Sequence, residues 1–239
     1  MSQVVRDIEE ALDVLATAEK AEFLPRFFKT GKGEYGEGDV FIGVTVPDQR
    51  KVAKAFAGDI ELRDLSSLLS SAIHEHRLTA LLILILQFEK LKDLESKKIY
   101  IDFYLNHLPF VNNWDLVDST AYKILGNFCY LLEDDSILIG LSKSENMWEK
   151  RIAVVATLFY IKKRNYTLTK EFVLRNLHHP HDLMHKANGW MLREIGKQDE
   201  LELVEFLEKY YQKMPRTTLR YAIEKLDEDR RQDFLKGNI

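Results

Sequence analysis

Residues 112–118 read Asn-Asn-Trp-Asp-Leu-Val-Asp, and the chain on both sides of this stretch determines the fold. The asparagines suit an N-cap and Asp115 suits an electropositive first turn, so the stretch predicts the start of a helix over Trp114 to Leu132. Residues four apart lie on one helix face, which places Trp114 beside Asp118. An indole beside a carboxylate suits a flat or cationic ligand. The alternative interpretation is a helix start in which Trp114 is a core anchor.

Apolar residues recur at helical spacing along most of the remaining chain. Pro47 suits the first turn of a helix that begins after Thr45 or Val46, and Asp93 is a candidate N-cap. Every element predicted after Gly43 is helical. Besides the helix that Pro47 opens, the predicted helices are 4–18, 21–29, 62–71, 76–92, 94–108, 114–132, 135–143, 147–163, 169–177, 183–196, 200–211, 215–226 and 229–235.

One segment near residues 31–43 interrupts the helical pattern. It contains five glycines, and its last residues, 39–43, have local β character, so we expect a loop or a short hairpin. No Gly-Lys-Ser or Gly-Lys-Thr follows, so the segment is not a Walker phosphate loop. A turn or a substrate-facing loop is the better interpretation.

The helices are about 10 to 18 residues long, and short turns join them. No shift in composition marks a domain boundary, so we expect one domain over residues 1–239. The pattern predicts an all-α fold, an α-solenoid of stacked antiparallel helix pairs with roughly 35 to 45 residues per HEAT-like repeat. In such a stack, one helix of each pair lines the concave face, where we expect the functional site.

Composition excludes several classes of protein. The single cysteine, Cys129, excludes an internal disulfide framework and a multi-cysteine zinc site, which favours a reducing compartment. No apolar run approaches the ~20 residues that span a bilayer, and the longest, residues 80–86, suits a buried helix. The N-terminal residues are acidic and have no signal-peptide core. We therefore expect a cytoplasmic protein that does not bind membranes.

The charge of the chain is unevenly distributed. The whole chain carries a formal net charge of −4, but residues 143–197 hold eleven Lys or Arg against five Asp or Glu. A basic face on an acidic protein is therefore expected, and such a face suits nucleic acid.

Three groups of residues in the basic region have both a functional and a structural interpretation. Arg151, at the start of a helix, suits a bidentate grip on a phosphate, and the alternatives are a solvated arginine or an ordinary ion pair. Residues 162–164 suit a helix C-terminus whether or not they bind DNA. Gly189 beside Trp190 in a helix indicates close packing or a substrate-facing indole. The histidines at 178, 179, 181 and 185 are separated by Pro180, so a loop fits better than a zinc site.

Several motifs together resemble the HEAT-like-repeat DNA glycosylases known as DNA alkylation repair enzymes. The resemblance extends over roughly residues 5–225. Its most specific motifs are Trp-Asp-Leu-Val-Asp at 114–118 and Gly-Trp-Met-Leu-Arg-Glu at 189–194, and the other matching stretches are 19–22, 43–50 and 148–151.

The resemblance implies a glycosylase that removes purines made cationic by alkylation at N3 or N7, from duplex DNA in a concave basic groove. Asp118 would be catalytic, Trp114 and Trp190 would flank the deoxyribose, and Arg151 would hold the DNA backbone. Phe27 takes the place of an active-site tyrosine of the family and lacks its hydroxyl. The resemblance implies no metal, no cofactor and no deep base pocket. We further expect a monomer.

Weaker candidates for DNA contacts are Thr45, Lys162, Lys163 and Arg193. The glycine-rich residues 32–39 look like an insertion relative to the family pattern. Members of related branches bind DNA, including branched DNA, without excising bases. A non-catalytic DNA-structure-binding protein is therefore one alternative, and a protein-binding α-solenoid scaffold is another.

Overall fold

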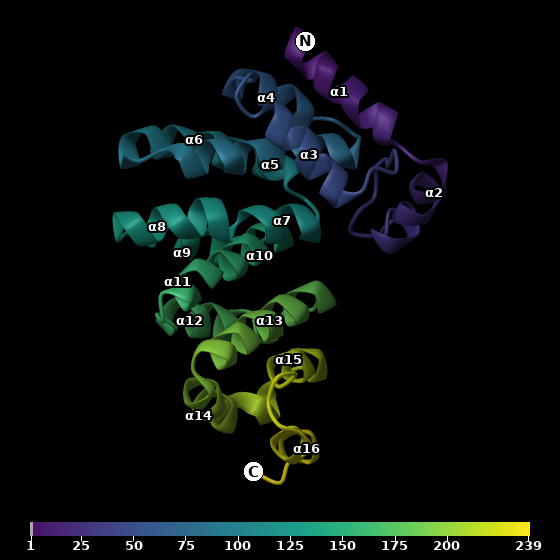
Figure 1. Ribbon diagram of the computed structural model, residues 1–239. Helices are drawn as coiled ribbons and strands as arrows, with labels where there is room; N and C mark the ends of the chain where they lie inside the picture. The colour runs from purple at the N-terminus through teal and green to yellow at the C-terminus, as the bar shows by residue number, and fades with distance from the viewer. Residues whose placement is uncertain (1) are drawn as a thin grey trace. The chain divides into compact units, whose positions relative to one another are not determined.

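The computed structural model describes residues 2–239 and divides the chain into two compact units, Met1–Thr120 and Ala121–Ile239. Within the described residues, all regular elements are helical apart from one isolated β-bridge (Figure 1). In each unit the helices pack mainly on near neighbours in the chain. This confirms the predicted all-α fold class of helical repeats, of the α-solenoid type. The single-domain prediction over residues 1–239 stays a prediction.

The first unit is organised around α5, the longest of its helices. Its elements are α1 (Gln3–Leu15), α2 (Ala18–Phe27), α3 (Val46–Phe56), α4 (Leu62–Leu69), α5 (His74–Lys90), α6 (Leu94–Asn106), the 3-10 turn Leu108–Phe110 and α7 (Trp114–Thr120). Helix α5 packs against α3, α4, α6 and α7. It is covered on nearly all sides, since 13 of its 17 residues are buried, which is the behaviour of a core helix. The buried residues are polar in the first turn and mostly apolar after it.

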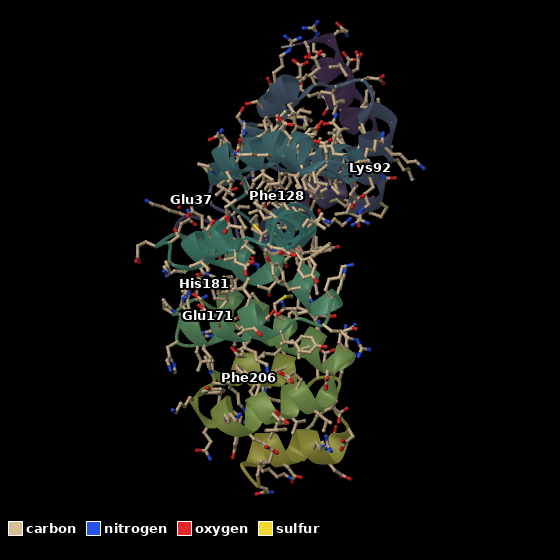
Figure 2. All side chains as sticks on the ribbon, turned by 90° about the vertical axis from the view of Figure 1, so that its left-hand side faces the viewer. Glu37, Lys92, Phe128, Glu171, His181 and Phe206 are labelled. Carbon is tan, nitrogen blue, oxygen red and sulfur yellow. The ribbon has the colours of Figure 1, made fainter. Side chains whose placement is uncertain are left out.

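The second unit is organised around α13. Its elements are the π-helical turn Tyr122–Gly126, α8 (Asn127–Leu132), α9 (Ser136–Ser142), α10 (Met147–Ala156), α11 (Leu158–Lys162), α12 (Thr167–Arg175), α13 (Asp182–Gln198), α14 (Glu200–Tyr210), the 3-10 turn Tyr211–Lys213, α15 (Arg216–Ala222) and α16 (Glu228–Lys236). Helix α13 packs against α10, α14 and α15. Phe206 of α14 is buried within this unit (Figure 2).

Several expected helix ends are confirmed by their caps. The Thr45 side chain caps α3, with Pro47 in its first turn, and Asp93 accepts the Ser96 N–H at the start of α6. Predicted bounds differ from the structure at several places. The helix predicted over 114–132 is divided into α7, the π-helical turn Tyr122–Gly126 and α8, and the ends predicted at 18, 21 and 226 are wrong by three or four residues. Two further differences have a clear physical reason. Helix α5 begins at His74 rather than 76, and the predicted helix 147–163 is interrupted at Thr157, whose buried hydroxyl donates to the Val154 carbonyl at 2.7 Å.

The glycine-rich segment is a loop whose backbone pairs with the residues at the start of α5. The Val40 N–H donates to the Ala72 carbonyl at 3.0 Å, and the His74 N–H donates to the Val40 carbonyl at 2.8 Å. These two bonds form a parallel bridge between Val40 and Ile73. The loop interpretation is therefore confirmed, and the hairpin does not form in the described residues.

Among the helices of residues 2–239, none is both long and apolar enough to cross a bilayer.

Gly189 allows α13 and α15 to approach closely. A Cβ atom at this position would lie 2.5 Å from the Thr218 carbonyl oxygen and 2.5 Å from the Tyr221 Cβ. Both distances are below any real carbon contact, so the two helices would have to move apart. The close-packing interpretation of Gly189 is therefore confirmed.

We predict that Gly189→Ala destabilises the protein by about 1–3 kcal/mol through overpacking. The matched control is Gly140→Ala, since Gly140 lies in α9 with nothing within 4 Å of an added Cβ. Higher helix propensity should raise the stability of that variant by about 1 kcal/mol at most. Chemical denaturation of both variants checks the pair. Equal stability of the two variants would contradict the packing argument.

Candidate functional site

Glu75, the second residue of α5, holds the end of the glycine-rich segment. Its side chain is buried, and its carboxylate accepts the backbone N–H groups of Gly43 at 2.8 Å and of Ile42 and Val44 at 3.2 Å. Hydrogen bonds to a carboxylate are charge-assisted and belong to the strong class. The segment that precedes α3 is therefore fixed to the first turn of α5.

Gly43 is required at its position for two reasons. Its φ of +87° lies in the left-handed region, and an added Cβ would lie 2.1 Å from the Thr17 carbonyl oxygen. The Thr17 hydroxyl in turn donates to the Gly43 carbonyl at 3.1 Å. The start of α2 is therefore tied to the same segment that Glu75 holds.

A buried network of charged side chains joins three elements of the first unit. One ring nitrogen of His74 lies 2.9 Å from Asp39 Oδ2, and the other lies 2.8 Å from Asp115 Oδ2. Arg77 donates to the second oxygen of Asp39 at 2.6 Å, and the Asn113 amide donates to Asp39 at 3.2 Å. The glycine-rich segment, α5 and α7 therefore meet at His74, whose exposure is only 2%.

The protonation of this network follows from its geometry. Burial by itself lowers the pKa of His74, but the Asp115 charge and the hydrogen bonds to Asp115 and Asp39 outweigh burial and raise the pKa to about 9. Burial raises the pKa of Asp39, but the hydrogen bond from His74 and the Arg77 charge outweigh it and lower that pKa. At neutral pH, His74 is therefore an imidazolium that donates from both ring nitrogens.

Trp114, the first residue of α7, lies against two phenylalanines. Its ring stacks on Phe28 with centroids 5.2 Å apart and planes 6° apart, and it meets the Phe27 ring edge-on at 5.8 Å. Phe28 stacks in turn on Phe41 at 4.9 Å. Trp114 is half-buried and Phe27 is 52% exposed, so this group presents an aromatic surface to solvent.

Asp118 lies one helical turn after Trp114 on α7 and is half-buried. The helix places the two side chains on one face, as the spacing in the sequence predicts. The structure also brings Phe27 to Trp114, from a position 87 residues earlier in the chain. A carboxylate beside a partly exposed indole can attract a cation by its charge and by the negative ring face.

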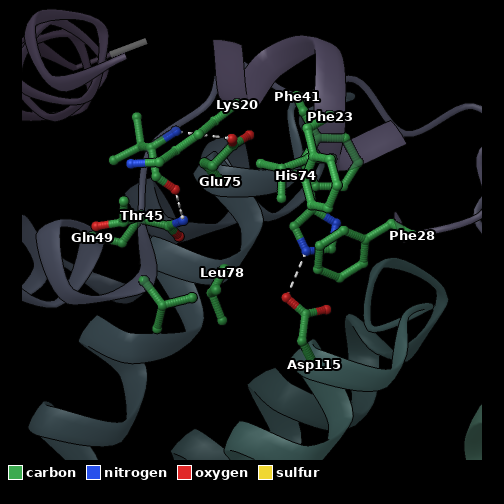
Figure 3. A pocket seen from close by; sticks show the side chains of 13 residues that line it. Lys20, Phe23, Phe28, Phe41, Thr45, Gln49, His74, Glu75, Leu78 and Asp115 are labelled. Atoms are coloured by element: carbon green, nitrogen blue, oxygen red, sulfur yellow. Dashed lines mark hydrogen bonds and ion pairs between the residues drawn. The ribbon is translucent and has the colours of Figure 1, made fainter. Parts of the chain in front are cut away.

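The first unit contains a cavity of about 290 Å³, and Phe28 is one of the residues that line it (Figure 3). Carbon atoms form nearly all of its walls, and His74, Glu75 and Asp115 are among the lining residues. A nucleobase buried there would have few partners for its hydrogen-bonding edge, which makes burial of that edge costly. The apolar walls suit apolar groups better than a base.

Arg151 is 4% exposed, and its Nη1 donates to the Leu183 carbonyl in the first turn of α13, so the interpretation as a solvated arginine is wrong. The guanidinium therefore helps to join α10 to α13 within the second unit. Its role at a DNA phosphate stays a prediction.

Trp190 and Arg193 lie on α13 with Glu194. Trp190 is half-buried and its indole N–H donates to Glu194 at 3.1 Å, while Arg193 pairs with Glu224. The sequence left open whether Trp190 is a core residue or faces a ligand, and the half-buried ring has features of both. Their roles in binding sugar and DNA stay predictions.

The remaining candidates for DNA contacts differ in how available they are. Lys162 and Lys163 are exposed, with their ammonium groups over the rings of Tyr122 at 4.5 Å and Phe159 at 5.7 Å. Thr45 is already engaged, because its hydroxyl donates to Asp48 Oδ2 at 2.6 Å and accepts the Asp48 N–H at 3.3 Å.

Three of the histidines near Pro180 form side-chain hydrogen bonds to the local backbone. His179 accepts the His181 N–H, His181 accepts the Leu183 N–H as the N-cap of α13, and His185 bonds to the His179 carbonyl. Over residues 2–239 no group of three or more His, Cys, Asp or Glu side chains is placed to hold a metal ion.

No pattern in the sequence indicates a role for His74, Asp39, Arg77 or Glu75. The sequence places Asp115 only in the electropositive first turn of its helix, whereas the structure buries it, and a buried acid requires a partner. The predicted start of α5 at residue 76 left His74 outside the helix. It therefore hid the one-turn spacing that places His74 and Arg77 on the same side.

We predict that stability falls as His74 loses its proton. A folded-state pKa of about 9 against an ordinary 6.5 contributes about 3 kcal/mol, present in full below pH 6.5 and lost as pH rises through about 9. Denaturant unfolding of wild type and His74→Gln at about pH 7 and pH 10 isolates this contribution, because other groups titrate equally in both. If wild type lost no more unfolding free energy than His74→Gln between the two pH values, the raised pKa of His74 would be contradicted.

Comparison with known proteins adds three findings. The family model described as "DNA alkylation repair enzyme" matches residues 8–226. Among solved structures, a predicted DNA alkylation repair enzyme from Enterococcus faecalis has a TM-score of 0.69 and 18% identity, covering 89% of this chain and 97% of that chain. At this identity the structural likeness supports the fold alone. A search of curated proteins gives no match.

Proposed function

Because the chain belongs to the DNA alkylation repair enzyme family, we propose that it hydrolyses the N-glycosidic bond of purines alkylated at N3 or N7 in duplex DNA. Family membership assigns a role in DNA repair, and the choice of bond and base is our proposal. The observation that carries it is the aromatic surface of Phe27 and Trp114, with the Asp118 carboxylate on the same face of α7 as Trp114.

The protein needs to give the leaving group little help, because the alkylated purine is already cationic. Alkylation makes the purine cationic, so when the bond from C1′ to the purine nitrogen breaks, its electron pair returns to the ring and neutralises the base. Positive charge then develops on the sugar, and water adds to C1′ with loss of a proton. Asp118 is proposed to stabilise that charge and to orient the water.

The aromatic surface has a complementary role in this proposal. The faces of Trp114 and Phe27 carry partial negative charge and attract a developing oxocarbenium ion. Phe27 supplies a ring without a hydroxyl, so it can contact the sugar but cannot move a proton. In the second unit, Trp190, Arg151, Arg193, Lys162 and Lys163 are proposed to add contacts to sugar and backbone, and Thr45 of the first unit one more.

We predict that Asp118→Asn lowers the rate of 7-methylguanine release from duplex DNA by about 100-fold or more, because the carboxylate charge is lost in the transition state. Chromatography of the released base under single-turnover conditions measures the rate, and fluorescence anisotropy measures DNA affinity. The matched control is Asp59→Asn, which alters an exposed acid of the same unit.

Three outcomes separate the alternatives. Base release that depends on Asp118 but not on Asp59 supports the glycosylase. Tight DNA binding with no base release by wild type would identify a non-catalytic DNA-binding protein. Absence of DNA binding even at low salt would favour a protein-binding scaffold.

We also predict that Lys162→Gln with Lys163→Gln weakens binding to all duplex sequences and reduces the slope of log affinity against log salt by about 1 to 2. Each lysine that contacts a phosphate releases condensed counterions, so its loss flattens the salt dependence. Lys98→Gln is the control, since Lys98 is an exposed lysine in the first unit that pairs with Asp102 at 2.9 Å. An unchanged slope in the double variant would exclude both lysines from the DNA contact.

A further inference from the structure

The residues on both sides of Trp114 in the chain are tied to the same buried charged pair. Asp115 accepts from His74 at 2.8 Å, and the Asn113 amide donates to Asp39 at 3.2 Å. The Asn113 side-chain oxygen also accepts the Trp114 N–H at 2.8 Å. The first turn of α7 is therefore held on both sides of Trp114.

This arrangement fixes the rotation of α7 about its own axis. Asp115 and Asp118 are three residues apart, and Trp114 precedes Asp115, so the direction of the Asp115 carboxylate sets the directions of the other two side chains. Turning α7 to aim Trp114 elsewhere would break the bond between His74 and Asp115, which Figure 3 shows as a dashed line.

The charges that face His74 come from its own helix and from the two elements packed against it. Asp39 lies on the glycine-rich segment, Arg77 lies on α5 with its Nη2 3.4 Å from the His74 ring, and Asp115 lies on α7. Two cations face two carboxylates when His74 is protonated. The rings of Phe28 and Phe41 cover the imidazole at 4.9 and 4.7 Å, and His74 is 2% exposed.

Loss of one proton disrupts the network in a defined way. A neutral imidazole has one N–H donor and one bare nitrogen, so one of the two carboxylates would face a lone pair at under 3 Å. Repulsion then drives either Asp39 or Asp115 away from His74. Both outcomes loosen the first turn of α7, because Asn113 holds Asp39 and Asp115 belongs to that turn.

We propose that His74 is a positioning residue, which through Asp115 and Asp39 holds α7 at the angle where Trp114 and Asp118 face the sugar of the damaged nucleotide. This inference rests on the proposed glycosylase function, to which it adds His74, Asp115 and Asp39 as residues that position the site. The glycine-rich segment is, through Asp39, a supporting part of the site.

The test measures single-turnover release of 7-methylguanine by wild type and His74→Gln from about pH 6.5 to pH 10. Base loss and ring opening without enzyme are subtracted at each pH. The wild-type rate should be steady to about pH 8 and fall about tenfold by pH 10, one unit above the pKa. At pH 7.5 the His74→Gln variant should release base at least about tenfold more slowly than wild type, and its rate should not fall further as pH rises. Its affinity for DNA should stay within about threefold of the wild-type affinity.

The matched control is His76→Gln, which alters another buried histidine of α5. His76 bonds to Ser71 at 3.2 Å and takes no part in the network around His74. This variant should keep both the wild-type rate and its fall at alkaline pH. Equal slowing of His74→Gln and His76→Gln would show a general disturbance of α5 and overturn the positioning role.

A second variant keeps the proposal testable if His74→Gln does not fold. Asp115→Asn retains an oxygen that accepts from His74 but removes the charge that favours the imidazolium. Its rate should therefore begin to fall at lower pH than that of wild type. A fall at the wild-type pH would overturn the proposal.

The results distinguish failure of the positioning role from failure of the proposed glycosylase function. A wild type that releases no base at any pH refutes the glycosylase, and the role of His74 in that reaction with it. An active wild type with an equally active His74→Gln refutes only the positioning role.

Discussion

The buried network of Asp39, His74, Arg77 and Asp115 is the constraint on which the candidate site depends. Removing charged groups from water costs several kcal/mol per ion unless each is paired and hydrogen-bonded. Here each carboxylate has a cationic partner, and both nitrogens of His74 are used. The cost of burial is thereby offset only in one arrangement of the glycine-rich segment, α5 and α7.

The aromatic surface is built on that arrangement. Phe28 and Phe41 cover the imidazole, Phe28 supports the Trp114 ring, and Phe27 completes the exposed edge. The Glu75 carboxylate adds a second attachment by binding the backbone N–H groups that precede α3. A rigid support of this kind suits a reaction in which a carboxylate must lie close to a developing sugar cation. It therefore fits the proposed glycosylase reaction.

The helical fold could be predicted because its signals are local. Apolar spacing located most helices, and the caps at Thr45 and Asp93 were readable from single residues. The wrong start of α5 has a physical cause, since its first turn is filled by buried polar residues that do not follow the apolar pattern. The interruption at Thr157 comes from a buried hydroxyl that bonds to its own helix, which an apolar count does not detect.

The sequence by itself determined the fold class, the placement of Trp114 beside Asp118 and the glycine-rich loop. Each depends on residues within a few positions of one another, where helix geometry and glycine content are sufficient. Only the tertiary structure decided that Phe27 meets Trp114, that Arg151 is buried against α13, and that His74 lies between two carboxylates. These contacts join residues about 30 to 90 positions apart, and packing rather than local propensity selects such partners.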